Sequence, residues 1–587
     1  MNTRLGYVKA TLSAFVLIGT ACAPVAPAPA AAPTNAAPGA GPTLVVAPAA
    51  TTADQPKPGG RLIVGDGSDS KTLQPVISTD TSSSLVWARM YETLIDVDPK
   101  TGSPVPRLAE KFEVSPDSKT MTFTLRDGLQ WSDGSAFSGD DFAFTVEAVM
   151  RSKRTVRKSI FQDIIGAKDY RDGKAESISG IKVDGKTITV QLETAFCPGL
   201  INIGGFAIIP RSVFGKYMDP KDASKNIDDA AENSAPTLAM GPFKFKEWVP
   251  NDHITLVRND KFFGGLAYLD EWVRRVYPDA NALAAALKTG EIDLGSIEAK
   301  DFDTLRAVTT LNVMEYPNNG FTYIGWNELR GGKEFFQNKA IRQALAYGLN
   351  MDLVIDKVLF GHGQKMVAHT PPTSWAYDST GLNDYKYDPA KAEQLLDQAG
   401  FAKGADGIRQ HNGQPLEFTL ITNSGNTIRE TLIQIAAEQY KQIGVNVTPR
   451  TEAFEALVER TDHSKDPTYG EQGGRDVDAW VSGWALGADP DAYSIWHSSQ
   501  IQGGFDDTGY KNADVDKALQ DGRTKCAQAD RQAAYKVLNK QLNEDQPYNF
   551  GYSANNLLVA STRVQGIEPG SYSRFAQWNI NKWWVKP

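Results

Sequence analysis

The chain has 587 residues, of which 41% are hydrophobic and 22% are charged, values close to the averages of soluble globular proteins. This composition excludes a collagen-like chain, a coiled-coil rod and wholesale disorder. The 70 Asp and Glu residues outnumber the 61 Lys and Arg residues, and the net charge of −9 predicts no nucleic-acid partner. Beyond residue 21 no uncharged apolar run approaches the length of a membrane-spanning helix.

Residues 1–21 predict an export signal. Arg4 and Lys9 supply positive charge, and the uncharged stretch 10–21 is too short to span a bilayer but has the length of a signal's apolar region. Gly-Thr-Ala-Cys at 19–22 resembles the lipobox of bacterial lipoproteins, where the cysteine is acylated and becomes the N-terminus, although Gly19 replaces the usual Leu. The alternative is ordinary signal-peptidase cleavage, which leaves Cys22 without a role.

Residues 22–58 predict a disordered linker. Positions 23–58 hold 13 Ala and 9 Pro, and only Asp54 and Lys57 are charged. Such a segment buries too little apolar surface to fold, and its prolines favour an extended spacer. With Cys22 acylated, this spacer would anchor the protein to a membrane and hold the folded body away from it.

The folded body begins at residue 59. Alternating apolar and polar residues predict a half-buried strand from residue 121, Asp140 or Asp141 is expected to cap a helix over 142–150, and Asp184-Gly185 predicts a hairpin over 181–192. Later amphipathic segments predict helices, and strand-like runs lie between them; the helices are 281–288, 340–360, 390–399, 427–443 and 531–543, and the strands are 416–422 and 445–447. Mixed strands and helices in this order predict an α/β fold.

The motifs that carry chemistry give no positive argument for catalysis. The run from Gly180 to Thr187 has the spacing of a P-loop, but it lies in the predicted hairpin and no helix follows it. No histidines pair at metal-ligand spacing, and no nucleophile elbow is present, so we expect no enzyme activity, no cofactor and no metal. Cys197 and Cys526 could form a disulfide in an oxidising compartment or remain two free thiols.

Short motifs follow one another along most of the chain. They are Ala-Arg-Met-Tyr-Glu-Thr-Leu-Ile at 88–95, Trp-Ser-Asp-Gly at 131–134, Gly-Glu-Ile-Asp at 290–293, Ile-Arg-Gln-Ala-Leu-Ala-Tyr-Gly at 341–348, Gly-Trp at 483–484 and Asp-Pro at 489–490. Together, in this order, they resemble the extracytoplasmic solute-binding proteins of the dipeptide/oligopeptide ABC-transporter family. Most of them predict scaffold; Ile341, Ala344, Leu345 and Gly348, for example, fall on one buried helix face.

The resemblance implies a two-lobe, periplasmic-binding-protein-like α/β fold that closes on a ligand about a hinge. Lobe I is expected at 59–97, 236–318 and 552–587, an inserted subdomain at 98–235, and lobe II at 319–551. The implied protein is an exported monomer in the periplasm or on the outer face of the cell membrane. It captures a peptide or another small solute and delivers it to an ABC-transporter permease. An extracytoplasmic hydrolase and a non-transport sensor on the same fold are the alternatives.

The resemblance also places the ligand between the lobes. Thr81, in the stretch 79–84, would face it from one side, and the loop at Gly483 and Trp484 from the other. Gly483 permits a close approach of the backbone, and Trp484 offers a flat apolar wall with one N–H donor, although core packing is the alternative for this side chain. The other candidate ligand contacts are Ala485, Asn327, Tyr91 and Arg460.

Peptide-binding members of the family commonly hold the α-amino group of the peptide with an Asp shortly after the Gly-Trp pair. Here Leu486 and Gly487 occupy the positions where that Asp would fall. Asp489 is the only nearby acid, and its place before Pro490 matches a structural Asp-Pro better; the alternative is a shifted loop in which Asp489 takes the ammonium. We therefore expect weak binding of simple dipeptides and a neutral or modified solute, such as a blocked peptide or an oligosaccharide stacked on Trp484.

Overall fold

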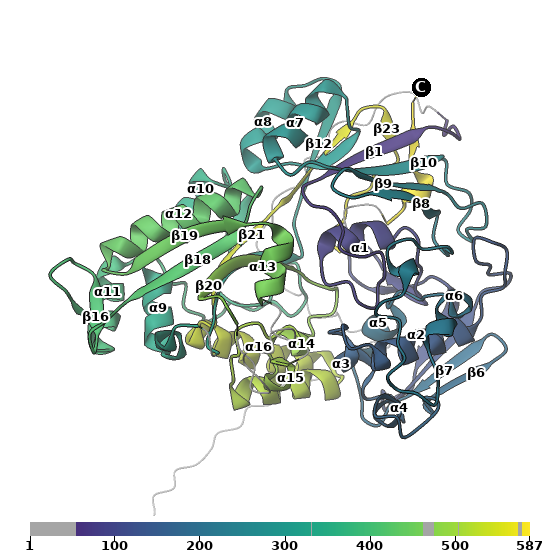
Figure 1. The fold of residues 1–587 in the computed structure, drawn as a ribbon, viewed down its shortest axis with the longest axis horizontal. Coiled ribbons are helices and arrows are strands. Elements are labelled where there is room, and N and C mark those ends of the chain that lie inside the picture. The colour runs from purple at the N-terminus through teal and green to yellow at the C-terminus, as the bar shows by residue number, and fades with distance from the viewer. Residues whose placement is uncertain (1–54, 330–331, 462–474, 503, 573–577, 587) are drawn as a thin grey trace, which may run out of the picture. The chain divides into compact units, whose positions relative to one another are not determined.

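The computed structural model describes residues 55–329, 332–461, 475–502, 504–572 and 578–586. The predicted export signal, Cys22 and nearly all of the predicted linker lie outside these residues. In the described part, two large mixed sheets and one antiparallel sheet of four strands alternate with helices (Figure 1). The expected α/β fold class is confirmed.

A seven-stranded sheet, in the order β12-β22-β11-β1-β10-β9-β8, forms the first body, which we call lobe I. Its central strand β1 (Arg61–Asp66) pairs in parallel with β10 (Glu271–Val276) and β11 (Leu294–Ser296). The other strands of this sheet are β8 (Phe243–Val249), β9 (His253–Arg258), β12 (Leu311–Tyr316) and β22 (Asn556–Ser561), and the helices of lobe I are α1 (Thr81–Trp87), α7 (Ala280–Thr289) and α8 (Phe302–Arg306).

A six-stranded sheet, in the order β14-β21-β13-β20-β18-β19, forms the second body, lobe II. β13 (Gly320–Trp326) lies between two antiparallel neighbours, β20 (Ala479–Ala485) and β21 (Tyr548–Ala554). The other strands are β14 (Gly363–Lys365), β18 (Glu417–Asn423) and β19 (Asn446–Glu452). The helices are α9 (Lys339–Tyr347), α10 (Met351–Lys357), α11 (Pro389–Gln398), α12 (Thr427–Gln442), α13 (Phe454–Thr461), α14 (Tyr493–Trp496), α15 (Ala513–Thr524) and α16 (Gln528–Asp545).

The four-stranded sheet β4-β5-β7-β6 and the short helices around it form a third part, which we call the insert. Its strands are β4 (Ala109–Val114), β5 (Thr120–Leu125), β6 (Ile181–Asp184) and β7 (Thr187–Gln191), and its helices are α2 (Gly139–Arg151), α3 (Lys158–Phe161), α4 (Ala167–Arg171), α5 (Gly199–Gly204) and α6 (Arg211–Phe214). Minor sheets pair β2 (Ile95–Val97) with β3 (Pro104–Pro106), β15 (Ala402–Lys403) with β16 (Arg409–His411) and β17 (Gln414–Pro415), and β23 (Val564–Gln565) with β24 (Trp584–Val585).

Lobe I and the insert share one hydrophobic core. A single cluster of buried side chains runs from Leu62 and Trp272 in lobe I to Met121, Phe123 and Ile188 in the insert. The large buried clusters of lobe II consist of residues from lobe II alone. The insert and lobe I are therefore packed together through one continuous core.

The chain crosses between the two lobes at two short connections, from β12 to β13 and from β21 to β22. Glu315, at the end of β12, accepts hydrogen bonds on Oε1 from Asn555 Nδ2 at 2.6 Å and from His362 Nδ1 at 2.9 Å. His362 and Asn555 thus bring the two crossings together. Short connections at the ends of elements are where hinge motions are usually absorbed.

The hairpin over 181–192 is confirmed as β6 and β7, with Gly185 at φ 55° in the turn. The helix over 142–150 is confirmed as α2, but neither Asp140 nor Asp141 is its N-cap. Ser138 holds that position: its side chain accepts from the Asp140 N–H, and the Ser138 N–H donates to Asp141 Oδ2 at 3.1 Å. Asp141 is the third residue of the helix, where an acid completes a capping box.

The segment 340–360 is two helices and not one. α9 ends at Tyr347, and the Asn350 side chain caps α10 by accepting from the Leu353 N–H at 2.9 Å. The predicted buried face of α9 is confirmed, because Ile341 and Leu345 are fully buried. The remaining expected elements are confirmed within two or three residues as α7, α11, α12, α16, β5 and β18, while β19 extends well beyond the short strand expected.

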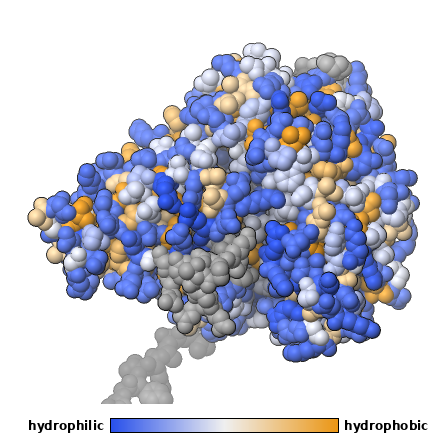
Figure 2. All heavy atoms as spheres, viewed as in Figure 1, coloured by the Kyte–Doolittle hydropathy of each residue, from blue (hydrophilic) through white to orange (hydrophobic). Residues whose placement is uncertain are grey.

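No helix among the described residues combines the length and the apolar character needed to cross a bilayer. On the face shown in Figure 2, apolar residues are scattered among hydrophilic ones. Leu266 and Phe360 are the most exposed large apolar side chains of the described part, and isolated residues of this kind are normal on a protein surface.

Candidate ligand-binding site

Gly483 and Trp484 lie near the end of β20, in the middle of the lobe II sheet. Their partners on β13 are Thr322 and Phe321, respectively. The strand ends at Ala485, which is exposed, and a loop then leads to α14. The strand pairing therefore holds Gly483 and Trp484 within β20, near the edge of the sheet at which this strand ends. The loop in which they were expected begins only after Ala485.

Trp484 covers a stack of aromatic rings. Its indole lies nearly parallel to the Tyr323 ring at 6.3 Å, and Tyr323 stacks on Tyr548 at 3.7 Å. Trp484 Nε1 donates to Tyr548 Oη at 3.3 Å, and Phe505 meets the indole edge-on at 5.4 Å. Tyr323 and Tyr548 are buried, whereas Trp484 stays partly exposed. The ring thus packs on the core and still presents a flat surface that suits an apolar or planar ligand group.

Arg429 lies beside Gly483 and was not found from the sequence. A Cβ atom on Gly483 would lie 2.7 Å from Arg429 Nη2, so the missing side chain makes room for the guanidinium. Arg429 Nη1 donates to Asn423 Oδ1 at 3.0 Å, and no carboxylate in the described part of the chain forms an ion pair with it. Burial lowers the pKa of Arg429. Arg429 is partly exposed, and a cation that has no anionic partner among the described residues favours a negatively charged ligand group.

Asn319 fixes the loop that follows Trp484. This buried residue lies in the crossing between β12 and β13, and its Nδ2 donates to the carbonyl oxygens of Leu486 at 3.0 Å and Gly487 at 2.8 Å. The Leu486 N–H donates in turn to the Asn319 carbonyl at 2.8 Å. A residue at the hinge therefore holds the loop beside the candidate site, a role that nothing in the sequence indicated.

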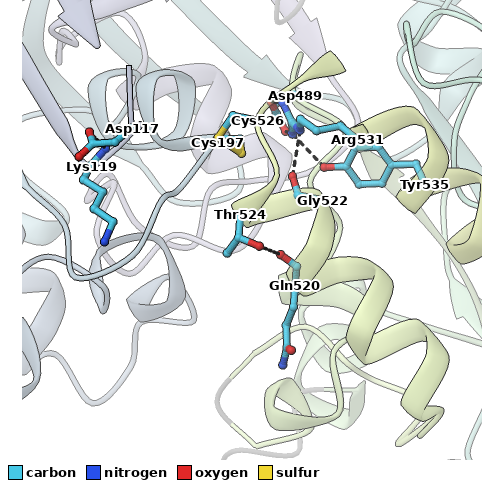
Figure 3. Close-up of a disulfide and its surroundings, with 10 residues drawn as sticks. All are labelled: Asp117, Lys119, Cys197, Asp489, Gln520, Gly522, Thr524, Cys526, Arg531 and Tyr535. Carbon is cyan, nitrogen blue, oxygen red and sulfur yellow. Dashed lines mark hydrogen bonds and ion pairs between the residues drawn. A yellow bond between two sulfur atoms is a disulfide. The ribbon is translucent and has the colours of Figure 1, made fainter. Parts of the chain in front are cut away.

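Asp489 forms a buried, bidentate ion pair with Arg531 of α16. The two N–O distances are 2.6 and 2.9 Å, and the two side chains are 5% and 8% exposed. Arg531 also donates to Tyr535 Oη and to the Gly522 carbonyl (Figure 3). Burial raises the pKa of Asp489, and Arg531 opposes this shift. A ligand ammonium would have to displace Arg531, so the geometry favours the structural role for Asp489.

On the lobe I side, Thr81 is the exposed first residue of α1. The helix is capped by Asp80, whose carboxylate accepts from the Ser83 N–H and from its hydroxyl, both at 2.7 Å. Tyr91 is buried, and burial raises the pKa of its phenol. Thr81 therefore has surface available for a ligand in this conformation, and Tyr91 has little.

Asn327 and Arg460 are engaged within lobe II. Asn327 is 0% exposed, and its Nδ2 donates to the carbonyls of Val477 at 2.7 Å and Arg475 at 3.2 Å. Arg460 is partly exposed and pairs with Glu452 at 3.0 Å and Asp476 at 2.7 Å. The structure does not bring these two residues together with Trp484 through any contact of the described residues.

A second contact joins the lobes near Arg429. Glu298 of lobe I accepts on Oε1 from the backbone N–H of Thr427 at 2.9 Å, and its Oε2 accepts from the Thr427 hydroxyl. Thr427 is the first residue of α12, so a carboxylate of one lobe lies at the positive end of a helix in the other, which is favourable. We call this contact the Glu298 latch.

Among the described residues, no group of His, Cys, Asp or Glu side chains is arranged to hold a metal ion. The site consists of an aromatic surface, an arginine without an acidic partner and backbone at a strand end. This arrangement suits reversible, non-covalent binding.

Comparisons with known proteins agree with this description. Residues 103–505 match the family described as bacterial extracellular solute-binding proteins, family 5 Middle. The oligopeptide-binding protein AppA of Bacillus subtilis is 30% identical over 92% of this chain and 94% of its own length. A probable ABC transporter-binding protein of Deinococcus radiodurans is 29% identical over 75% of this chain and 76% of its own length.

Solved structures extend the likeness to the fold. The AppA structure from Bacillus subtilis, in complex with a nonapeptide, has a TM-score of 0.81 with 29% identity, covering 91% of this chain and all of that one. Lactococcal OppA, with an endogenous peptide in the closed conformation, has a TM-score of 0.77 at 22% identity, covering 88% of this chain and 99% of that one, and shows the two-lobe fold alone. The chain is a solute-binding protein of two lobes and belongs to family 5 of the bacterial extracellular solute-binding proteins.

Proposed function

We propose that this protein captures peptides between its lobes and delivers them to the permease of an ABC importer. The proposal is supported by the likeness to AppA over nearly the whole chain. The structural observation that carries it is the partly exposed Trp484 on its buried ring stack, at the rim of the lobe II sheet. Trp484, Gly483, Ala485 and Thr81 are the proposed ligand contacts, and binding needs no catalytic group.

The ligand's α-amino group is not an anchor in this proposal. Both carboxylate oxygens of Asp489 already accept hydrogen bonds from Arg531, and Leu486 and Gly487 carry no charge. Arg429, which forms no ion pair with a carboxylate of the described residues, instead favours a ligand carboxylate, because charge-assisted bidentate contacts of arginine with carboxylates are among the strongest hydrogen bonds. We therefore propose peptides longer than two residues, with the N-terminus free or blocked and the C-terminal or a side-chain carboxylate near Arg429.

Calorimetry with defined peptides tests these statements. We expect a nonapeptide and its N-acetylated form to bind alike, and free dipeptides to bind at least tenfold more weakly. Amidation of the C-terminus should weaken binding in the wild type and have no effect in Arg429→Gln. Micromolar binding of free dipeptides that is lost in Asp489→Ala would overturn the proposal, as would an oligosaccharide retained by the purified protein in native mass spectrometry.

We further propose that the mature protein is a membrane-anchored monomer without enzymatic activity. Lobe I would comprise 59–97, 236–318 and 555–587, the insert 98–235, and lobe II 319–554, where the boundary expected at 552 moves to the end of β21. Acylation of Cys22 would supply the anchor. Wild-type protein should incorporate labelled fatty acid and partition into detergent, and Cys22→Ala should do neither; labelling of the variant would contradict the anchor.

A further inference from the structure

A disulfide joins the two bodies that must separate to admit a ligand. Cys197 lies in the insert, between β7 and α5, and Cys526 lies in lobe II, between α15 and α16. The two Cα atoms are 5.0 Å apart, although 329 residues separate the two cysteines in sequence. Figure 3 shows the bond beside the first turn of α16, near Arg531 and Asp489.

The contact around this disulfide is well packed. The Cys197 N–H donates to the Arg523 carbonyl at 2.7 Å. The Arg523 guanidinium pairs with Asp491 at 2.6 Å within lobe II and lies 4.9 Å from the ring centre of Phe196 in the insert. Arg523 is buried, and its Nη1 reaches the Ser159 carbonyl of the insert at 3.4 Å. The cross-link is therefore part of an interface and not an isolated surface bond.

The disulfide adds a third covalent link between the two bodies. Lobe I and the insert share one core, and lobe II has cores of its own. The other links are the two chain crossings, from β12 to β13 and from β21 to β22, which lie on different elements from Cys197 and Cys526. Two bodies joined at a hinge alone can swing in several directions. A third fixed point leaves rotation about a line through the hinge and the disulfide.

We infer that the Cys197–Cys526 disulfide keeps the insert docked on lobe II throughout the ligand cycle, so that the cleft opens at the Glu298 latch and not at the insert. The inference rests on the two-lobe fold and does not depend on the ligand being a peptide. Two backbone amides report on it. The Thr427 N–H closes the latch between the lobes, and the Cys197 N–H closes the contact beside the disulfide.

Hydrogen exchange on ligand-stripped, oxidised full-length protein is the test. We expect the amide of Thr427 to exchange at least tenfold faster than the amide of Cys197, because only the latch opens. In Cys197→Ser/Cys526→Ser the Cys197-site amide should become at least tenfold faster and the radius of gyration in solution scattering should rise. Thr524→Ser, which keeps the disulfide, removes one methyl group and retains the hydroxyl that donates within α15 to the Gln520 carbonyl, is the matched control and should behave like the wild type.

Treatment of the wild type with a water-soluble phosphine gives the same comparison without a substitution, because Cys526 is exposed to reductant. Reduced protein should show the radius of gyration and the exchange pattern of the double variant. The inference is overturned if the oxidised wild type exchanges the Cys197 amide as fast as the Thr427 amide. It is equally overturned if reduction leaves both the radius of gyration and the exchange at Cys197 unchanged.

Discussion

His369 is a buried histidine of lobe II that water does not reach. Its Nδ1 accepts a hydrogen bond from Trp496 Nε1 at 3.0 Å, and the Phe321 ring meets it edge-on at 5.5 Å. Burial lowers the pKa of His369 to about 3, and the Asp491 carboxylate opposes this shift without reversing it. The folded protein therefore holds a neutral imidazole across the range in which a free histidine becomes charged.

This burial predicts a pH dependence of stability. Below the ordinary histidine pKa of about 6.5, His369 binds a proton in the unfolded chain, whereas in the folded protein it does so only near pH 3. The free energy of unfolding therefore falls as the pH falls through this window. From pH 7.5 to pH 5 the loss from this group is about 2 kcal/mol. Urea unfolding at both pH values should show that extra loss in the wild type and not in His369→Gln. The exposed His411→Gln is the control and should retain it.

The Asp489–Arg531 pair predicts a second effect at this scale. Removing one partner leaves the other charge buried without compensation, so Asp489→Ala should lower the free energy of unfolding by about 3–5 kcal/mol. Replacing both residues, as in Asp489→Leu/Arg531→Met, should cost much less, since neither charge remains. Equal destabilisation by the single and double variants in urea unfolding would show that the ion pair is not the source of the cost.

Single residues also mark the limit of sequence inference. The sequence offers Trp484 as a candidate because the Gly-Trp pair belongs to a motif, and its role as a ligand contact stays a prediction. The places of Arg429 and Asn319 could not be predicted, because Arg429 lies in an ordinary amphipathic helix and Asn319 in a short connection. The packing of α12 beside β20 brings Arg429 to Gly483, and the connection before β13 brings Asn319 to the loop after Trp484. Asn327 and Arg460 are the opposite case, because the sequence offered them as ligand contacts and the structure gives them other partners. Asn327 donates to the Val477 carbonyl and Arg460 pairs with Asp476, and no pattern in the sequence indicated either contact.

At the scale of secondary structure, the N-terminus of α12 connects the lobes. The Glu298 latch supplies a carboxylate and two hydrogen bonds at the first residue of that helix. Periodicity predicted α12 almost to the residue, and its N-cap, Asn426, is local, but no pattern within a helix indicates that a carboxylate of another lobe also binds at its first residue. Local signals also failed at Ser138, which caps α2 in place of an Asp, and at Gly348, where a continuous apolar pattern hides the break between α9 and α10.

The latch predicts a change in how tightly the closed form holds its ligand. Hydrogen bonds to a charged group contribute about 1.5–3 kcal/mol, so Glu298→Ala should weaken ligand retention roughly tenfold or more. The measurement is the fraction of co-purified ligand that native mass spectrometry detects. Glu291→Ala is the matched control, because the side chain of Glu291 bonds to Arg275 and Tyr277 of its own lobe. Equal retention by the two variants would argue against the latch.

At the scale of the whole molecule, the two lobes have separate cores that a ligand couples. The two-lobe fold could be predicted from motif order along the chain, whereas the pairing of Cys197 with Cys526 could not, because nothing in either local sequence specifies a partner 329 residues away. Contacts between the lobes depend on how whole sheets are placed relative to each other. The hydrophobic periodicity of a sequence predicts single helices and strands but not this placement, so these contacts could not be predicted.

Coupling of the lobes predicts ligand-dependent stability. A ligand that binds only the folded, closed protein stabilises it by about 2.7 kcal/mol at 100 times its Kd. Scanning calorimetry should therefore show a higher Tm with ligand and a merging of separate lobe transitions into one. A Tm that rises for lobe II alone would place the ligand within that lobe and not between the two.

The cross-link also constrains how the chain is made. Cys197 is synthesised long before Cys526. Its thiol therefore stays unpaired with Cys526 until all but the last 61 residues of this sequence have been synthesised. The chain contains three cysteines, which permit three pairings. If Cys22 is acylated, as proposed, its thiol is not available for a disulfide, and Cys197 with Cys526 is the pairing that remains. Lipid attachment would then serve the folding of the exported protein as well as its location.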